Sequence, residues 1–251
     1  HSFGLGCLHT SIAQSATTII FKNTINLKII IDSIEKQKAT GFVGVPTTFQ
    51  NILDNYKENF KEKGKKLRYM LTNSAPMLEK DVKEIMNILP STKIFTYYGL
   101  TEASRSTFLL FNSNLDKIES VGTPVHQVKI KIVGKECKQL ENFQLGEIWI
   151  KGPNVIENYL DNERSKLRDG WLQTGDLGYL DNEGYLYIKG RKDEIINVGG
   201  EKVAPIEIET AIRQIEEVQD VGVIGVTNRT FGEIPVAYIV TKSEIKEQEI
   251  V

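Results

Sequence analysis

Three short segments of the chain combine glycine with side chains that bind nucleotides or metal ions. The first is Tyr97-Tyr-Gly-Leu-Thr-Glu102. Gly99 allows a sharp turn and a close approach of backbone to a ligand. Tyr98 offers a flat face for a base, while Thr101 and Glu102 offer a hydroxyl and a hard carboxylate oxygen for a phosphate with its magnesium ion. An ordinary strand-to-helix turn is the alternative interpretation.

The other segments lie near the middle and the end of the chain. Asp176 stands in Thr174-Gly-Asp176, where a glycine-flanked loop would let the carboxylate accept hydrogen bonds from a ribose diol. The alternative is a turn Asp that caps its own backbone. Arg191 can fork onto a phosphate or ribose, and Gly199-Gly200 can line a narrow channel, unless this segment is a charged linker followed by a hairpin turn.

The first half of the chain predicts alternating helices and strands. Helical patterns cover 28–39, the residues after Pro46 and the stripe 82–89, and apolar strands are expected at 41–45, 67–72 and 93–97. Such alternation indicates a parallel sheet covered on both faces, whose ligands bind beyond the carboxyl ends of the strands. The segments 73–76 and 98–102 follow such ends.

The second half changes period. Residues 128–133, 146–151 and 184–189 alternate with a period of two, which predicts a small distorted barrel. Beyond Gly190 we expect a helix from Pro205, with Ile208, Ala211, Ile212 and Ile215 buried, and strands at 221–226 and 234–240. The predicted fold class is therefore α/β: a partial doubly wound subdomain over 1–115, a barrel-like subdomain over 116–190, and a truncated mobile α+β domain over 191–251.

Composition excludes several classes of protein. The net charge of −2 gives no basic surplus for nucleic acid, and the apolar runs are too short to cross a bilayer. Cys7 and Cys137 indicate reduced thiols in a cytoplasmic protein. No Gly-x-Gly-x-x-Gly fingerprint supports a Rossmann oxidoreductase. Because the chain starts at His1 inside an apolar segment and stops at Val251 in a charged one, we expect a piece of a longer protein.

The ordered occurrence of these segments resembles the acyl-adenylate-forming (AMP-binding) superfamily. Tyr98-Gly-Leu-Thr-Glu102, Thr174-Gly-Asp176 and Gly190-Arg-Lys-Asp193 are similar to three of its core motifs. Asn73-Ser-Ala-Pro76 and His1-Ser-Phe-Gly4 are similar to two weaker ones. The resemblance covers nearly the whole chain, and the run 203–209 is most like acyl- and aryl-CoA ligases.

The resemblance implies a role for each matching residue. Tyr98, beside Tyr97, would lie against adenine; Thr101 would bind the α-phosphate, and Glu102 would hold Mg²⁺. Ribose would be bound by Asp176, and the nucleotide would also be contacted by Arg191. Ser74, Ala75 and Pro76 would border the acyl and adenine pockets, and Asp193 would be the domain hinge. Gly199 and Gly200 would lie beside the pantetheine channel. His1, with Phe3, would stand near the reacting carboxylate.

The implied activity is ATP-dependent conversion of a carboxylic acid, fatty or aryl, to acyl-AMP and then to acyl-CoA. Its cofactors and substrates would be ATP, Mg²⁺ and coenzyme A. A phosphate loop before His1 and a lysine after Val251 would be missing, so we expect this piece alone to be inactive. Two alternatives stay open: an adenylation domain that loads an acyl carrier protein, and a non-catalytic remnant that binds a nucleotide or a partner protein.

Overall fold

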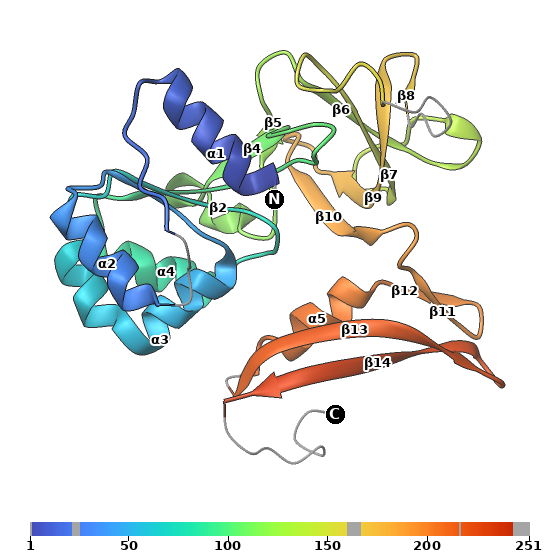
Figure 1. Ribbon diagram of the computed structural model, residues 1–251. Coiled ribbons are helices and arrows are strands. Elements are labelled where there is room, and N and C mark those ends of the chain that lie inside the picture. Colours follow the sequence, from blue (N-terminus) through green and yellow to red (C-terminus); the bar gives the residue numbers. More distant parts are fainter. Residues whose placement is uncertain (1, 22–25, 160–166, 216, 243–251) are drawn as a thin grey trace. The chain divides into compact units, whose positions relative to one another are not determined.

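The structure is a computed structural model that describes residues 2–21, 26–159, 167–215 and 217–242. The chain folds into two compact units, coloured along the sequence in Figure 1. The first comprises His1–Lys129, Ile150–Ser165 and Gly184–Leu186, and the second comprises Ile130–Trp149, Lys166–Glu183 and Tyr187–Val251.

The first unit is built on a five-stranded sheet of order β1-β2-β3-β4-β5. Its strands are β1 (Gly41–Val43), β2 (Tyr69–Thr72), β3 (Lys93–Tyr98), β4 (Thr107–Leu110) and β5 (Thr123–Pro124). β1, β2 and β3 run parallel, as the alternating pattern predicted, whereas β4 and β5 pair antiparallel. Short 3-10 helices, η1 (Phe111–Ser113) and η2 (Leu115–Lys117), follow β4.

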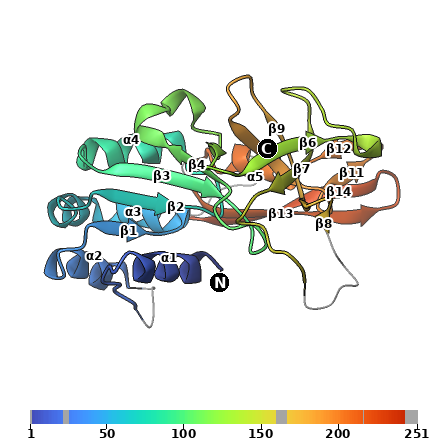
Figure 2. The same cartoon turned by 90° about the horizontal axis from the view of Figure 1, so that it is seen from above.

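Helices lie on both faces of this sheet (Figure 1). α2 (Leu27–Lys36), α3 (Pro46–Lys63) and α4 (Glu79–Ile88) cover one face, and α1 (Ser2–Ala13) lies on the other. Figure 2 shows β1, β2 and β3 side by side with these helices around them. Pro46 begins α3 at the position where its missing N–H costs no hydrogen bond.

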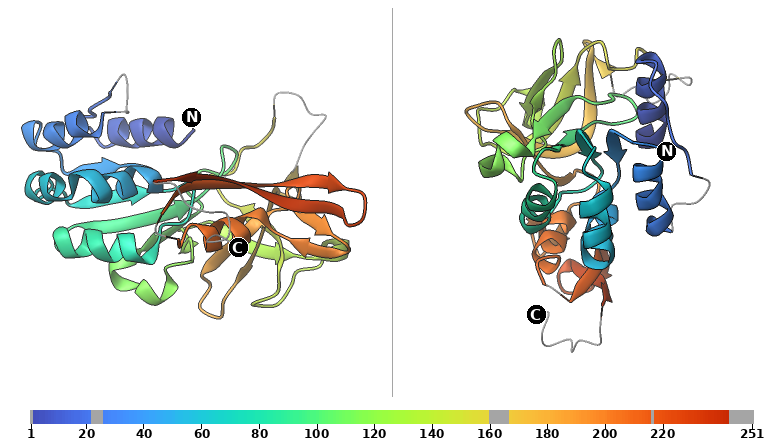
Figure 3. Two further views of the ribbon diagram at one scale, coloured as in Figure 1. Left: turned by 90° about the horizontal axis from the view of Figure 1, so that it is seen from below. Right: turned by 90° about the vertical axis from the view of Figure 1, so that its left-hand side faces the viewer.

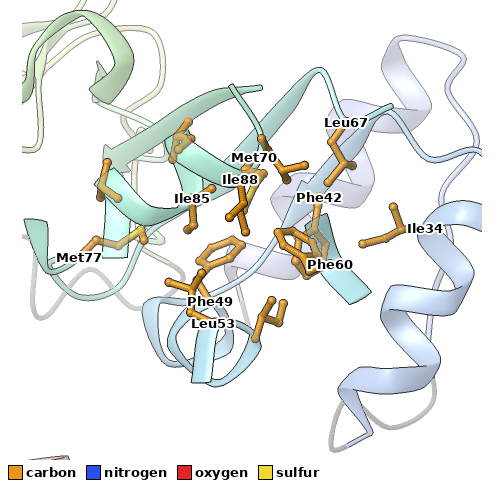
Figure 4. Packing of buried hydrophobic residues seen from close by; sticks show 14 of the residues in the cluster. Ile34, Phe42, Phe49, Leu53, Phe60, Leu67, Met70, Met77, Ile85 and Ile88 are labelled. Atoms are coloured by element: carbon orange, nitrogen blue, oxygen red, sulfur yellow. The ribbon is translucent and has the colours of Figure 1, made fainter. Parts of the chain in front are cut away.

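The core of the first unit lies between the sheet and α2, α3 and α4 (Figure 4). Phe49 and Phe60 of α3 are buried there against Phe42 of β1, with ring centroids 5.5 Å and 6.0 Å from that of Phe42. The apolar spacing predicts two buried stripes, one at Phe49, Ile52, Leu53 and Tyr56 and the other at Val82, Ile85, Met86 and Leu89. Both are confirmed in the main, because only Tyr56 and Met86 are half-buried.

The second unit holds most of a five-stranded sheet, in which β10-β9-β7-β6 form a continuous path and β8 pairs with β9 off this path. The strands are β6 (Lys129–Val133), β7 (Gly146–Lys151), β8 (Leu167–Arg168), β9 (Trp171–Leu180) and β10 (Leu186–Arg191), and η3 (Lys135–Cys137) follows β6. The three predicted alternating segments correspond to β6, β7 and β10. Among the described residues the pairings follow an open path.

A second sheet in this unit, of order β12-β11-β14-β13, is formed by the last described part of the chain. It contains β11 (Ile196–Val198), β12 (Glu201–Val203), β13 (Val218–Asn228) and β14 (Gly232–Thr241), with α5 (Pro205–Ile212) against it. Figure 3 shows β13 and β14, in orange and red, as two long strands that pair with each other. The predicted helix at Pro205 is confirmed, but Ala211 is exposed; only Ile208, Ile212 and Ile215 of its predicted stripe pack on the core.

Cys7 and Cys137 are both free thiols. Within the described ranges, none of the helices has the length and apolar character that a membrane span requires.

Candidate nucleotide-binding site

Two predicted ligand loops leave neighbouring strands of the first unit at the same edge of its sheet. β2 and β3 are parallel, with Thr72 beside Thr96, so the segment 73–76 and the segment 99–102 both follow carboxyl ends. Ser74, Ala75 and Pro76 are all exposed, and Ser74 has a φ of 83°. In an open α/β sheet this edge is where ligands bind.

The turn after β3 is held by backbone hydrogen bonds. Leu100 N donates to Ala103 O at 3.0 Å, and Ser106 N donates to Tyr98 O at 2.8 Å. A Cβ atom on Gly99 would stand 2.4 Å from Arg105 N and 2.8 Å from Ala103 O, so the turn excludes every larger residue. The predicted requirement for glycine is therefore explained by the return of the chain on itself.

Thr101 and Glu102 occupy the tip of this turn. Thr101 is exposed and Glu102 is half-buried. The Glu102 carboxylate accepts a hydrogen bond from the Tyr159 hydroxyl at 3.3 Å. Burial raises the pKa of Tyr159, and the negative charge of Glu102 and the hydrogen bond to it raise this pKa further. The hydroxyl is consequently held in its protonated, hydrogen-donating form.

The donor set fits a magnesium ion that arrives with its nucleotide. Among the residues that the structure describes, no group of three or more His, Cys, Asp or Glu side chains is arranged to hold a metal ion. Mg²⁺ is commonly bound by one or two carboxylates together with substrate phosphates and water. Glu102 supplies one such carboxylate at the exposed end of a turn.

The two tyrosines before the turn are buried, with Tyr97 exposed to 6% and Tyr98 to 7%. The Tyr97 ring lies 5.3 Å from Phe108 of β4 and 6.0 Å from Phe3 of α1, and the Arg105 guanidinium stands 5.5 Å from its centroid. Burial raises the pKa of Tyr97 to about 12, although Arg105 lowers it in part. Tyr97 thus joins α1 to the sheet. His1, which was predicted to stand with Phe3 near the reacting carboxylate, lies outside the described residues.

Asp176 belongs to the second unit, and the expectation that it stands in a loop is wrong. It lies in the middle of β9, where alternate residues are buried, and it is exposed to only 6%. Thr174 Oγ1 donates to Ile148 O at 2.7 Å and accepts from Asp176 N at 3.0 Å. The glycine beside Asp176 misled the prediction, because Gly175, with a φ of 78°, interrupts the regular strand without ending it.

Arg191 meets Asp176 although fifteen positions separate them. Its Nη1 atom lies 3.1 Å from Asp176 Oδ1, and its Nε atom lies 3.1 Å from Asp193 Oδ1. The hydrogen bond to Asp193 and the charges of Asp176 and Asp193 raise the pKa of Arg191. The structure therefore brings together two predicted nucleotide-binding residues and the predicted hinge residue.

Two further contacts that the sequence did not predict attach the end of β10 to β9 and β7. Lys192 N donates to Gly175 O at 2.8 Å, and Lys192 Nζ lies 3.3 Å from Glu147 Oε2. The other Glu147 oxygen accepts from Gly175 N at 3.3 Å. Glu147 was missed because its segment, 146–151, has the pattern of an ordinary strand, and Tyr159 because no glycine-containing motif surrounds it.

Gly199 and Gly200 form the turn of the β11–β12 hairpin, as the alternative interpretation of this segment expected. Their φ values of 62° and 102° lie in the left-handed region that favours glycine. Gly200 N donates to Asn197 Oδ1 at 3.0 Å, and Gly199 N donates to Phe231 O at 2.7 Å. The role of this turn at a channel stays a prediction.

Comparison with known proteins agrees with the predicted family. The family described as AMP-binding enzyme matches residues 1–160, and the AMP-binding enzyme C-terminal domain matches residues 207–251. The chain belongs to the AMP-binding enzyme family. The resemblance inferred from the motifs is thereby confirmed.

Relatives of this AMP-binding enzyme chain include CoA ligases. It is 30% identical over 256 residues to 2-succinylbenzoate–CoA ligase of Bacillus subtilis, matching 100% of this chain and 51% of that protein. It is 30% identical over 259 residues to 4-coumarate–CoA ligase-like 6 of Arabidopsis thaliana, matching 100% of this chain and 46% of that protein. The chain thus spans about half the length of the curated relatives it matches.

Solved structures confirm the predicted fold class. o-Succinylbenzoate CoA synthetase (MenE) from Bacillus subtilis, in complex with the acyl-adenylate intermediate OSB-AMP, matches with a TM-score of 0.85 and 30% identity over 99% of this chain and 51% of that one. The same enzyme in complex with ATP and magnesium ion gives the same TM-score of 0.85 at 30% identity, again over 99% of this chain and 51% of that one.

Proposed function

We propose that the complete protein containing this chain is an AMP-forming acid–thiol ligase. A carboxylate oxygen of the substrate attacks the α-phosphorus of ATP, the bond to the β-phosphate bridging oxygen breaks, and pyrophosphate leaves. The product is an acyl-AMP anhydride. The thiolate of coenzyme A then attacks the acyl carbon, and AMP leaves with the electrons of the broken carbon–oxygen bond. The net products are acyl-CoA, AMP and pyrophosphate.

The observation that carries the proposal is the common edge from which the turn at Thr101–Glu102 and the loop at Ser74–Pro76 emerge. Adjacent parallel strands end there, and β2 and β3 keep their register up to Thr72 and Thr96. This is the position in an open α/β sheet at which nucleotides bind. The names of the relatives support the same chemistry, because they are CoA ligases.

In the first unit we expect the turn to bind the phosphate end of ATP. The exposed Thr101 hydroxyl would donate to the α-phosphate, and Glu102 would hold Mg²⁺, which when bound neutralises phosphate charge. Tyr98, which is largely buried, would contact adenine with the exposed part of its ring. Ser74, Ala75 and Pro76 would border the adenine and acyl pockets.

In the second unit we expect the ion pair of Asp176 and Arg191 to bind the nucleoside. A ribose diol would donate to the Asp176 carboxylate, which lies 3.1 Å from Arg191 Nη1. Asp193 would be the hinge about which a mobile domain over 191–251 turns between the two half-reactions. That rotation would bring the Gly199–Gly200 turn to the pantetheine channel. The three-domain division, 1–115, 116–190 and 191–251, belongs to the same proposal.

The substrate that we favour is an aromatic carboxylic acid. The relatives named above are ligases of 2-succinylbenzoate and, by similarity of name, of 4-coumarate, and both of these acids carry a ring. His1 and Phe3 would stand near the reacting carboxylate. A fatty acid is the competing substrate class, and an acid panel separates the two.

The test supplies the complete protein with ATP, Mg²⁺, coenzyme A and a panel of aryl and fatty acids. With aryl acids we expect one AMP to form for each acyl-CoA. We expect pyrophosphate exchange into ATP to require the acid but not coenzyme A. Because the chain spans about half the length of its relatives, we expect it to turn over little by itself.

Other outcomes separate the alternatives. Acid-dependent pyrophosphate exchange without thioester formation would favour an adenylation domain that loads a carrier protein. ATP binding with no exchange for any acid would favour a non-catalytic nucleotide-binding protein. If the complete protein shows no pyrophosphate exchange and does not bind ATP, the proposed function is overturned.

A further inference from the structure

Residues 154–159 run along the turn that carries Thr101 and Glu102, within the same unit of the structure. Asn154 Nδ2 donates to Ser104 O and to Ser106 Oγ, both at 3.0 Å. Val155 forms an antiparallel bridge with Ala103, and Ile156 N donates to Glu102 O at 2.9 Å. Backbone and amide contacts therefore fasten this segment to the turn over successive residues.

At the end of this segment stands Tyr159, whose hydroxyl oxygen lies 3.3 Å from Glu102 Oε1. An ionised carboxylate can only accept hydrogen bonds, so the hydroxyl is the donor. Both side chains are half-buried. The contact joins residues 57 positions apart, and it engages one oxygen of the carboxylate while the other has no hydrogen bond within the described part of the chain.

We infer that Tyr159 is a positioning residue for Glu102, fixing the carboxylate in the orientation that receives a nucleotide-bound metal ion. This inference rests on the proposed function, which gives Glu102 the metal. A glutamate at the tip of an exposed turn has several rotatable bonds, and holding it in one rotamer costs conformational entropy. A hydroxyl donor on a segment that is attached to the same turn by Asn154, Val155 and Ile156 offsets that cost before the ligand arrives, as outer partners do for other metal-binding carboxylates.

The structure separates this role from a general structural one. The segment is attached to the turn by Asn154, Val155 and Ile156, whose contacts do not involve the Tyr159 hydroxyl. Tyr159→Phe keeps the ring and removes only the hydroxyl that reaches Glu102. Tyr185→Phe is the matched control, because it removes a hydroxyl that donates to Asn114 Oδ1 at 2.8 Å in the same unit.

The test measures metal binding directly in the complete protein. Mn²⁺ replaces Mg²⁺ as the probe, and its binding in the presence of a non-hydrolysable ATP analogue is followed by electron paramagnetic resonance. We expect Tyr159→Phe to weaken Mn²⁺ binding roughly tenfold, the lower end of the range for outer partners of metal ligands. Tyr185→Phe should bind Mn²⁺ as the wild type does, and thermal midpoints should match in all variants.

A double-mutant cycle identifies the carboxylate through which Tyr159 acts. Glu102→Gln should weaken Mn²⁺ binding by itself, and adding Tyr159→Phe to it should weaken binding no further. An unchanged Mn²⁺ affinity in Tyr159→Phe, beside a weakened one in Glu102→Gln, would overturn the inference and leave the role of Glu102 intact. The inference would also be overturned if Tyr159→Phe weakened Mn²⁺ binding by the same factor in the wild type and in Glu102→Gln.

Failure of the proposed function has a different signature. Glu102→Gln would then bind Mn²⁺ as the wild type does, or the wild type would show no acid-dependent pyrophosphate exchange. The first result would remove the metal from Glu102 and the inference with it. The exchange assay without any variant reports on the proposed function alone.

Discussion

Arg191 and Asp176 form an ion pair in which the guanidinium Nη1 lies 3.1 Å from the carboxylate Oδ1. The pair is asymmetric: the Asp176 side chain is exposed to 8%, whereas that of Arg191 is exposed to 35% and also contacts Asp193. A nucleotide that uses both residues therefore meets an acceptor already oriented by its neighbour. Removing either partner leaves the charge of the other without this contact.

The first prediction concerns Asp176→Ala in the complete protein. We expect the KM for ATP to rise at least about tenfold, because hydrogen bonds to a charged group contribute about 1.5 to 3 kcal/mol. Steady-state AMP formation measured against ATP concentration gives this value. Glu194→Gln is the matched control, since it removes an acidic group 3.8 Å from Arg191 without altering Asp176. A wild-type KM for ATP in Asp176→Ala would remove Asp176 from the site.

The second prediction concerns the proposed hinge. Asp193→Pro should slow thioester formation more than adenylation, because proline fixes φ at its own position and restricts Lys192 before it. Single-turnover measurement of acyl-AMP and of acyl-CoA separates the two steps. Asp193→Ala is the control that loses the contact with Arg191 but keeps the backbone free. Equal slowing of both steps by proline would contradict a hinge at this residue.

The elements that were predicted correctly from the sequence are those whose pattern is local. The helix at Pro46 and the strand ending at Tyr98 follow from apolar spacing and from a proline that can only begin a helix. Strand β9 was missed because its sequence is typical of a loop: Gly170 precedes it, and Gly175 and Gly178 lie within it. Its burial nevertheless alternates through Thr174 and Asp176, since polar side chains replace apolar ones on the inner face.

The site was predictable only in part for a similar reason. Residues 98–102 can be predicted as a site because glycine and side chains with oxygen donors stand together in the sequence. Tyr159 and Glu147 form hydrogen bonds with partners 57 and 28 positions away, Glu102 and Gly175, and a partner at that distance is set by the tertiary fold. Neither residue type nor local spacing contains that information.

The third prediction concerns the turn itself. Gly99→Ala should lower the free energy of unfolding by about 1 to 3 kcal/mol and abolish adenylation, since the added Cβ would stand 2.4 Å from the backbone nitrogen of Arg105. Backbone atoms at that distance cannot turn aside as a flexible side chain would. Denaturant unfolding and pyrophosphate exchange measure the two effects.

Gly222→Ala provides the matched control for Gly99→Ala. Gly222 lies in β13, and a Cβ atom added there would have nothing within 4 Å. We expect its stability and pyrophosphate exchange to stay close to those of the wild type. If Gly99→Ala behaves in the same way as Gly222→Ala, the close return of the chain after β3 is not required for activity.

The fourth prediction concerns the ionisation of Tyr97. Its pKa of about 12 in the folded protein, raised by burial, exceeds the value of about 10 expected for an unfolded chain. In this pH range the folded protein keeps a proton that the unfolded chain loses, so the contribution of Tyr97 to stability is complete below pH ~10 and declines as the pH rises towards 12. The full loss amounts to about 2 to 3 kcal/mol.

Two measurements check the ionisation of Tyr97. The phenolate absorbance of the wild type minus that of Tyr97→Phe should rise near pH 12 in the folded protein and near pH ~10 in denaturant. The free energy of unfolding should also fall less steeply with pH in Tyr97→Phe than in the wild type, because phenylalanine has no proton to lose. Equal slopes would mean that Tyr97 is accessible to water, and that Phe3 of α1 and Phe108 of β4 do not enclose its ring as the structure describes.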